Sequence, residues 1–320
     1  MHSHYAASAY HPERIPGQPS ARRGWLKRFG SSRLPWGRAQ DIYPISMLRG
    51  STPVELRAIE AYDEELASGK RQAQAYEQLD YHQVINHERY RHAPLAKRSL
   101  FWFYLWGGGR FVFWAMLFLL FFAWSVAAAN DPDGFISGYV GVVIRTAPTF
   151  LGTPLLCWAI GSFVVHKLPS WFVRPSKGPL WEFNRRTGLV TLFDYDNMGE
   201  YQRSGSIGEF VNPFHEFDAY ISSGPDRQGL IWHQLYLAHR YHDLTINLSP
   251  IVMRDTNLQP QYAGWDFLQN YMDTSRPLPD IPLFEQYREQ DPITAAHDRT
   301  TQRPARYWRD MDDASWDAKL

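Results

Sequence analysis

Two histidine-containing stretches are the groups whose residue types come closest to a metal site. His215 and Glu216 lie just before Asp218, and His239 and His242 lie three residues apart further along the chain. Zinc sites need three or four ligands at workable spacing, usually with cysteines or a helical H-E-x-x-H motif. Both stretches fall on predicted strands, where His239 and His242 would point to opposite faces. We therefore expect satisfied polar groups, with no metal and no cofactor.

Motifs for catalysis are missing from the sequence. It contains no G-x-S-x-G elbow, P-loop, G-x-G-x-x-G fingerprint or cysteine pair. The one cysteine, Cys157, lies in an apolar run, where a thiol packs as a small hydrophobe, and it excludes an internal disulfide. We expect a protein that is not an enzyme. A hydrolase that depends on His239 or Glu216 is the alternative, and substitution of either residue would test it.

Aromatic and arginine side chains are the usual anchors of protein interfaces. Trp308 and Trp316 lie in the charged tail stretch YWRDMDDASW. They either dock on the same protein, which is the preferred interpretation, or bind a partner. The candidate binding residues are Trp181, Arg185, Arg186, Trp265, Trp308 and Trp316.

The charge pattern is balanced overall but uneven locally. The chain has 33 Lys and Arg against 33 Asp and Glu, so no net charge attracts nucleic acid, and we expect no such partner. Residues 1–50, in contrast, hold eight basic and two acidic side chains and show no apolar periodicity. This composition predicts a disordered basic arm, with an interaction tail as the alternative.

Two uncharged stretches of 19 residues predict transmembrane helices over 111–129 and 147–165. At about 1.5 Å per residue, each is long enough to cross a hydrocarbon core of about 30 Å. The second contains Pro148 and Pro154, so a kinked or re-entrant segment is the alternative. Its Gly152 and Gly161 would allow close approach to the first helix. We expect residues 97–167 to form a two-helix anchor in membrane lipid.

Basic residues predict the orientation of this anchor. Five basic residues lie on each outer flank and one, Arg145, lies in the connection over 130–146. Because basic flanks stay in the cytoplasm, both termini should be cytoplasmic, with the short acidic connection outside.

The remaining segments predict the soluble parts. Thr52 and Glu55 form a capping box, Ser68-Gly69 ends that helix, and a second helix over 71–90 would complete an amphipathic helical segment, 51–96. Period-two stretches within 178–290 predict hairpins around 184–188 and 222–229 and a strand over 244–248, with a helix over 263–272. The fold class is thus an α+β membrane protein with a C-terminal antiparallel β-meander capped by a helix, similar in outline to pleckstrin-homology-like modules. Residues 291–320 form a tail.

Several distinctive strings extend from the second membrane flank into the tail. They are WEFNRRTGLVTLFDY (Trp181 to Tyr195), PFHEFDAYI (Pro213 to Ile221), LAHRY (Leu237 to Tyr241), WDFLQNYMDTSRPLPDIPLFE (Trp265 to Glu285) and YWRDMDD (Tyr307 to Asp313). In these strings the chain resembles an uncharacterised family, a domain of unknown function, of two-span membrane proteins from Gram-negative bacteria. Members are often encoded beside type VI secretion toxins.

The resemblance implies a bacterial inner-membrane protein whose partner is a cognate toxin or a secretion component. We expect toxin immunity or an effector accessory role through protein binding. The alternative is a membrane-anchored structural or signalling adaptor that recruits cytosolic partners, and deletion of residues 1–50 would discriminate the two.

Overall fold

The computed structural model describes residues 4–21, 32–37, 42–74, 77–132, 134–195, 203–204 and 207–320. The chain divides into two compact units. We name residues 1–72, 83–92 and 179–320 the folded domain, and residues 73–82 and 93–178 the helical unit. With the helices, the described strands make a mixed α+β protein, the class that the sequence predicts. The prediction of one C-terminal β-meander is wrong, because its strands are divided between two antiparallel sheets that N-terminal strands complete.

The first sheet of the folded domain has five strands in the order β2-β3-β4-β5-β6. They are β2 (Val84–Ile85), β3 (Arg89–His92), β4 (Trp181–Asn184), β5 (Leu189–Asp194) and β6 (Gly208–Pro213). The predicted hairpin of β4 and β5 is confirmed, with Gly188 in its turn at a φ of +70°. That left-handed conformation favours glycine, because a Cβ is crowded there.

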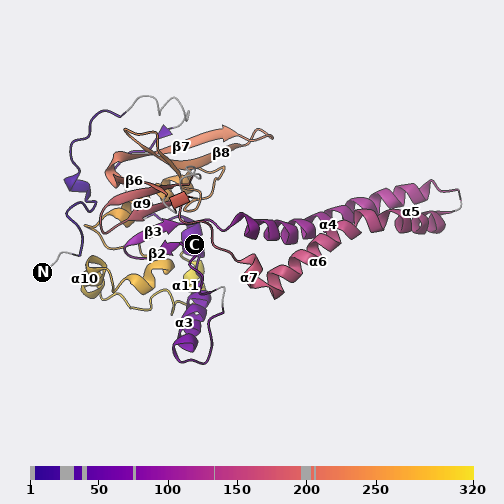
Figure 1. Cartoon of the computed structure of the whole chain (residues 1–320), viewed down its shortest axis with the longest axis horizontal. Coiled ribbons are helices and arrows are strands. Elements are labelled where there is room, and N and C mark those ends of the chain that lie inside the picture. The colour runs from indigo at the N-terminus through magenta and orange to yellow at the C-terminus, as the bar shows by residue number, and fades with distance from the viewer. Residues whose placement is uncertain are drawn as a thin grey trace. The chain divides into compact units, whose positions relative to one another are not determined.

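The pairing of β3 with β4 joins two segments that flank the helical unit in sequence. His92 in β3 lies opposite Trp181 in β4, although residues 93–178 separate the two strands along the chain. The helical unit is therefore an insertion into the sequence of the folded domain (Figure 1). The predicted end of the amphipathic helical segment, at residue 96, is wrong. Residues 83–92 belong to the folded domain, where they supply β2 and β3 of the first sheet. β2 and β3 are too short to show a clear period of two.

The second sheet has four strands in the order β1-β7-β8-β9. They are β1 (Ser32–Arg33), β7 (Phe217–Pro225), β8 (Ile231–His239) and β9 (Thr245–Asn247). β7 and β8 form the second predicted hairpin, which is longer than expected because residues 222–225 continue the strand. β9 confirms the predicted strand over 244–248.

Helix α9 (Gln259–Met272) confirms the predicted helix over 263–272 and packs into the core of the folded domain. Its Trp265 and Phe267 belong to one buried cluster with Val190 of the first sheet and Leu237 of the second. Burying a side chain such as Phe267 stabilises a fold by roughly 1.5–3 kcal/mol. The apolar face of α9 therefore connects the two sheets.

Parts of the predicted basic arm, residues 1–50, are ordered and contribute to this core. Tyr10 and Leu34 are 4% and 3% exposed. The indole of Trp265 donates a hydrogen bond to the carbonyl of Pro35 at 3.0 Å, and β1 pairs with β7. The prediction of disorder is therefore wrong for the described residues 4–21, 32–37 and 42–50. Its residues 1–3, 22–31 and 38–41 lie outside the described ranges. The apolar residues of the arm are too widely spaced to show a period.

The N-terminal helices are η1 (Pro12–Arg14), α2 (Ile45–Arg49) and α3 (Pro53–Ala67). The predicted capping box at the start of α3 is confirmed, since Thr52 and Glu55 each accept the other's backbone N–H. Gly69, at a φ of +70°, follows the end of α3. The second helix predicted over 71–90 is wrong in its described residues, which form turns and then β2 and β3. Residues 75–76 lie outside them.

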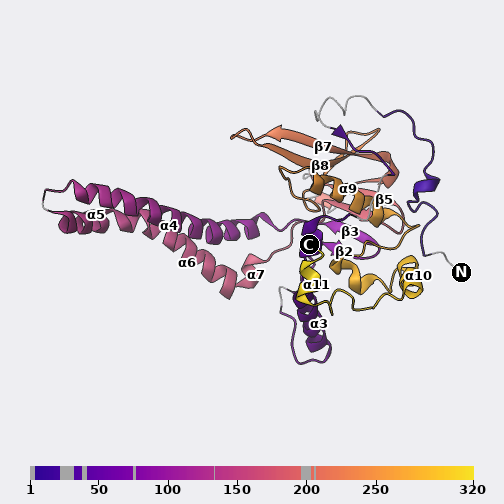
Figure 2. The same cartoon turned by 180° about the vertical axis from the view of Figure 1, so that it is seen from behind.

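The C-terminal helices are η2 (Phe214–Glu216), η3 (Pro282–Tyr287), α10 (Pro292–Thr301) and α11 (Asp313–Asp317). Trp308 and Trp316 form a small buried cluster with Leu56 of α3. Figure 2 shows the yellow α11 beside the purple α3. The tail therefore docks on the same protein, which confirms the preferred interpretation of its tryptophans.

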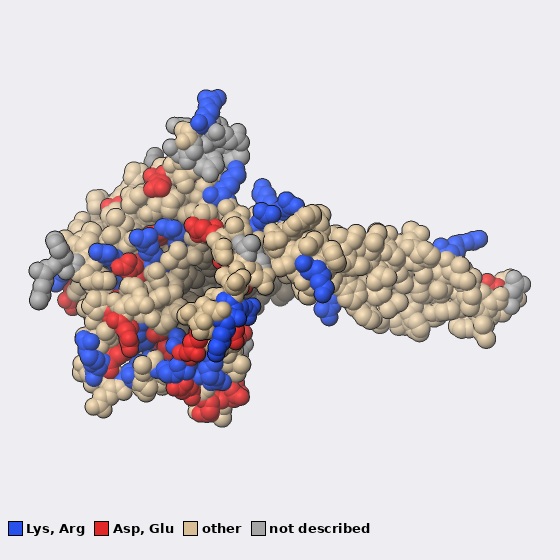
Figure 3. All heavy atoms as spheres, turned by 60° about the horizontal axis from the view of Figure 1, so that its bottom comes forward, with Lys and Arg blue, Asp and Glu red and all other residues tan. Residues whose placement is uncertain are grey.

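The helical unit contains α4 (Lys97–Ala129), α5 (Phe135–Phe150), α6 (Gly152–Lys167) and α7 (Pro169–Phe172). Among the described residues, α4 alone is a single helix long and apolar enough to cross a membrane, and only 11% of its most apolar window is buried. It includes the first predicted span, 111–129. Charged side chains are sparse on the visible face of this unit (Figure 3).

The second predicted span, 147–165, is wrong as one straight helix. α5 and α6 are bent by 42° at a break after Phe150, so they would count as a span only as a bent pair. Pro148 and Pro154 account for the bend, because proline lacks the helical N–H donor and its ring crowds the preceding turn. The expected connection over 130–146 is also too long, since α5 begins at Phe135 and Arg145 lies on that helix.

Glycines allow α4 and α6 to approach closely. A Cβ on Gly161 would lie 2.5 Å from the backbone nitrogen of Trp106, and one on Gly109 would lie 2.7 Å from that of Trp158. A larger residue at either position would therefore push the helices apart. The expected close approach is confirmed at Gly161, whereas Gly152 has no neighbour within 4 Å of such a Cβ.

Candidate binding pocket

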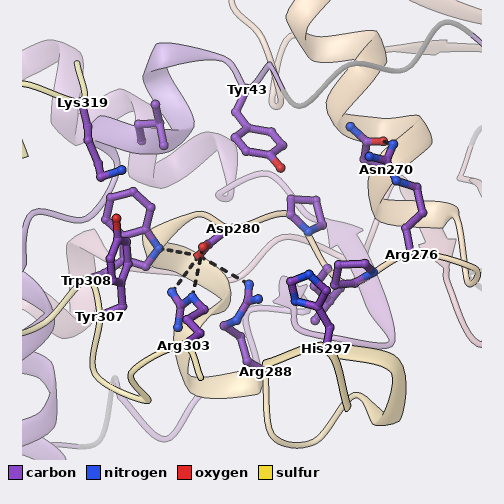
Figure 4. Close-up of a pocket in the computed structure, with 14 residues that line it drawn as sticks. Tyr43, Asn270, Arg276, Asp280, Arg288, His297, Arg303, Tyr307, Trp308 and Lys319 are labelled. Atoms are coloured by element: carbon purple, nitrogen blue, oxygen red, sulfur yellow. Dashed lines mark hydrogen bonds and ion pairs between the residues drawn. The ribbon is translucent and has the colours of Figure 1, made fainter. Parts of the chain in front are cut away.

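A pocket of about 580 Å³ lies in the folded domain, where residues near the start of α2 meet the C-terminal segments (Figure 4). Its wall combines basic and aromatic side chains. The basic residues are Arg276, Arg288, Arg303 and Lys319, the acidic one is Asp280, and the aromatic ones are Tyr43, Tyr307 and Trp308. His297 of α10 adds an imidazole. The wall therefore carries an excess of positive charge.

A proline-rich loop forms one side of the pocket. Residues 276–281 follow α9 without regular structure. Pro277 and Pro279 cannot donate backbone hydrogen bonds, and their rings restrict φ, so the loop cannot continue the helix. It places Arg276 and Asp280 in the pocket wall.

Asp280 lies at the centre of a network of charged groups (Figure 4). Arg303 donates to both of its carboxylate oxygens, from Nε at 3.0 Å and from Nη2 at 2.7 Å. The indole of Trp308 donates to Oδ1 at 2.9 Å, and Nη1 of Arg288 lies 3.4 Å from that oxygen. Bidentate pairs of this kind hold the guanidinium in one orientation.

Arg288 connects this network to α10. Its Nε and Nη2 each donate at 2.7 Å to the carboxylate of Asp298. Burial acts to raise the pKa of Asp298, but the hydrogen bond and the charge of Arg288 outweigh it and lower the pKa below its ordinary value. Nη1 of Arg288 is buried and makes no hydrogen bond among the described residues. A ligand oxygen in the pocket would complete its coordination.

Aromatic rings form the opposite part of the wall. The guanidinium carbon of Arg303 lies 4.8 Å from the ring centre of Tyr307. The ammonium of Lys319 lies 5.4 Å from the same ring and 5.7 Å from that of Trp308. Such cation–π contacts hold a cation over the ring. Arg303 already donates to Asp280 and to the carbonyl oxygen of Pro304, so of these two cations Lys319 is the one that can meet an anion. The pocket is therefore suited to a carboxylate or phosphate group beside a flat or apolar surface.

Arg185, a predicted binding residue, is fully buried and bonds within the protein. It follows β4 and reaches the C-terminal end of α9, where it donates to the carbonyl oxygens of Tyr271 and, at 2.8 Å, of Asp273. It also donates to Arg276 O at 2.8 Å, and its Nε lies 3.5 Å from Asp291. A cation at this end of a helix is favourable, because the carbonyl groups there carry partial negative charge. The side chain is unavailable to a partner in this conformation.

The other predicted binding residues divide by exposure. Trp181, Trp265, Trp308 and Trp316 are 2–6% exposed and pack in buried clusters. Of the six, only Arg186 is well exposed, at 53% of its side chain. Of these six predicted residues, Trp308 is the one that lines the pocket. The structure thus does not bring the six together as one binding surface, because large aromatic residues supply core area as readily as interface area.

The two histidine stretches form a closed hydrogen-bonded group. Nε2 of His239 lies 3.0 Å from Glu216, and its Nδ1 accepts the backbone N–H groups of Tyr241 and His242 at 3.1 Å. Burial lowers the pKa of His239, although Glu216 acts in the other direction. The rings of His239 and His242 lie 4.9 Å apart, so the prediction of opposite faces is wrong. β8 ends at His239, and the strand alternation ends with it.

Apart from Trp308, the pocket residues were not predicted from the sequence, because they come from separated segments between Tyr43 and Lys319. The one local signal was the loop RPLPDIP, which combines prolines with an arginine and an aspartate. Comparisons of the chain with family models, with curated proteins and with solved structures found no match.

Proposed function

We propose that this chain is a membrane-anchored binding protein, in which α4 with the bent pair α5 and α6 lies in a bilayer and the folded domain binds a protein partner. The observation that carries the proposal is the apolar surface of the helical unit. Phe111, Phe118 and Ile136 are 73%, 65% and 79% exposed. Apolar surface of this kind is unfavourable in water and favourable in lipid.

The basic flanks support a cytoplasmic position for the folded domain. The sequence on either side of the apolar helices holds five basic residues each, and basic residues stay on the cytoplasmic side. With the resemblance to two-span proteins encoded beside type VI secretion toxins, this favours an inner-membrane protein with both termini inside. The partner is then a cognate toxin or secretion component, and the role is immunity or effector accessory.

The pocket supports binding to an acidic group of that partner. Lys319 and the buried Nη1 of Arg288 line the pocket, and Tyr307 and Trp308 supply aromatic contact area. Arginine and aromatic side chains dominate binding energy in protein interfaces. No catalytic step is part of this proposal.

The membrane anchor predicts the behaviour of the protein during extraction. The full chain should stay with membranes through alkaline carbonate washing and require detergent for release. Leu119→Arg combined with Phe122→Arg should reduce membrane insertion sharply, since each arginine near the centre of a span costs about 2.5–3.5 kcal/mol. Ile231→Arg, a substitution of a 55% exposed residue in β8, is the matched control and should leave extraction unchanged. Release of the wild-type chain by carbonate would contradict the anchor.

Co-expression with the toxin encoded beside this gene tests whether that toxin is the partner. The wild-type chain should protect cells and appear in a detergent pull-down with the toxin. Lys319→Glu should weaken the complex at least about tenfold, because it places a negative charge in the pocket wall. Arg227→Glu, in the exposed turn between β7 and β8, is the control of equal charge change. Absence of both protection and complex with the wild-type chain would end the proposal.

Deletion of residues 1–50 is unsuited to separating this function from the adaptor alternative. Tyr10 and Leu34 are buried in the core, so the deletion would remove part of the fold together with any recruiting arm. Arg33 is also engaged, since it donates to Asp218 at 2.7 Å.

A further inference from the structure

Three potential metal ligands from two distant segments meet in the folded domain. His4 lies near the N-terminus, and His87 and Glu88 lie in the turn between β2 and β3. Their ligand atoms all lie within 4.8 Å of one another. Nε2 of His4 and Nε2 of His87 lie 3.8 Å and 4.0 Å from Oε1 of Glu88. The two imidazole rings are stacked, with centres 6.1 Å apart.

The two histidines also contain polar atoms that no described residue satisfies. Nε2 of His4 and Nδ1 of His87 are buried and have no hydrogen-bond partner among the described residues. Buried polar atoms in folded proteins nearly always have a partner, so Nε2 of His4, which is also the His4 atom nearest Glu88, calls for a missing group.

We propose that His4, His87 and Glu88 bind a divalent transition-metal ion of the zinc type. Two imidazoles and one carboxylate are a common protein ligand set for zinc, with water at the fourth position. Metal–ligand distances of about 2.0–2.2 Å place tetrahedral ligand atoms about 3.4 Å apart. The two histidines lie 3.8 Å and 4.0 Å from Glu88, and all three ligand atoms lie within 4.8 Å of one another, so the side chains must draw together to reach this value when the ion binds.

Arg186 would compete with the ion for the carboxylate of Glu88. Its Nη1 lies 3.5 Å from Oε1 of Glu88, and its side chain is 53% exposed, so it can turn toward water when the ion binds. Arg185 and Asp291 also act electrostatically on His87, but they are fully buried and bonded to other groups. Removing the Arg186 charge should therefore strengthen metal binding.

The ion would cross-link the N-terminal segment to the first sheet. His4 begins the described segment 4–21, which includes the buried Tyr10, whereas His87 and Glu88 belong to the β2–β3 turn. Metal binding should therefore protect this segment from proteolysis. That effect does not depend on a partner protein.

The experiment uses the untagged full chain in detergent, stripped of metal with a chelator and titrated with zinc sulfate. We expect one saturable zinc site per chain and slower proteolytic cleavage near the N-terminus with zinc. His87→Ala should weaken binding at least about tenfold, since even outer-shell changes at zinc sites have effects of about 10–100-fold. Arg186→Ala should tighten it. His233→Ala, which removes an imidazole of β8 outside both the cluster and the pocket, should bind zinc like the wild type.

Two results would contradict the proposed zinc site. Absence of saturable zinc binding would do so, as would equal affinity of the wild type and His87→Ala. The stretch Met1 to His4 also contains His2, so binding retained in His87→Ala would place the ion on the N-terminal peptide. Circular dichroism and thermal unfolding in chelator must match between the variants, which separates loss of binding from loss of fold.

Discussion

Replacing Arg185 by methionine is expected to lower the free energy of unfolding of the folded domain by about 3–5 kcal/mol, the usual effect of removing one partner from a buried ion pair. Arg185 is fully buried, and its guanidinium bonds the carbonyl oxygens of Tyr271, Asp273 and Arg276. Without it these acceptors and the carboxylate of Asp291 lose their cation inside the protein. Denaturation by urea, followed by tryptophan fluorescence of the full chain in detergent, measures the loss.

The neighbouring arginine provides the matched control. Arg186→Met removes the same charge from a side chain that is 53% exposed and pairs with Glu88 at 3.5 Å. Exposed ion pairs contribute about 0–1 kcal/mol, so this variant should unfold nearly like the wild type. Equal stability of the two variants would show that the buried network does not support the fold.

The pH dependence of the Arg185 variant follows from Asp291. Burial acts to raise the pKa of Asp291, but Arg185 together with hydrogen bonds from Thr294 and Tyr5 lowers it below the ordinary value. In the variant burial dominates, so this pKa should rise. Protonation then removes the unpaired charge, and the stability difference from the wild type should shrink as the pH falls toward about 4. A difference that stays constant with pH would contradict the assignment to Asp291.

Gly188→Ala is expected to destabilise the folded domain by about 2–5 kcal/mol and to loosen its N-terminal segment. A Cβ at this position would lie 2.6 Å from the backbone nitrogen of Tyr10 and closer still to the carbonyl oxygen of Ser8. The left-handed backbone adds about 1–2 kcal/mol of strain, and overpacking against a rigid backbone adds about 1–3 kcal/mol. Urea denaturation measures the first effect, and limited proteolysis within residues 4–21 measures the second.

Gly229→Ala separates strain from steric clash. Gly229 has a φ of +84°, but a Cβ there would have no neighbour within 4 Å. This variant should therefore show only the strain, about 1–2 kcal/mol, and no change in N-terminal proteolysis. If both glycine variants behaved alike, the close packing of Ser8 and Tyr10 on the β4–β5 turn would be wrong.

The features that local sequence could predict are those that depend on neighbours in the chain. The capping box at Thr52, the glycine turn at Gly188, the β7–β8 hairpin and helix α9 are all confirmed. Each depends on side-chain spacing or backbone preference within about a dozen residues. Of the two predicted apolar helices, α4 among the described residues is long and apolar enough to cross a membrane, whereas two prolines bend the second apolar stretch.

The candidate sites could not be predicted in this way. The pocket collects residues from Tyr43 to Lys319, and the proposed metal site joins His4 to the turn at His87 and Glu88. No periodicity connects such positions, since their distances follow from the packing of the whole domain. Arg185 illustrates the same point: its residue type suggested an interface, and its position places it against the end of α9.

The sequence by itself determined the apolar length of α4, the turns of the two hairpins and the antiparallel strands and helix α9 of the C-terminal half, because local backbone preferences and the burial of periodic apolar residues decide them. The tertiary structure alone decided that β3 pairs with β4 across the inserted helical unit and that Tyr10 and Leu34 complete the core. It also decided which charges are buried. These outcomes depend on contacts between residues far apart in sequence, and such contacts form only when the chain packs as a whole.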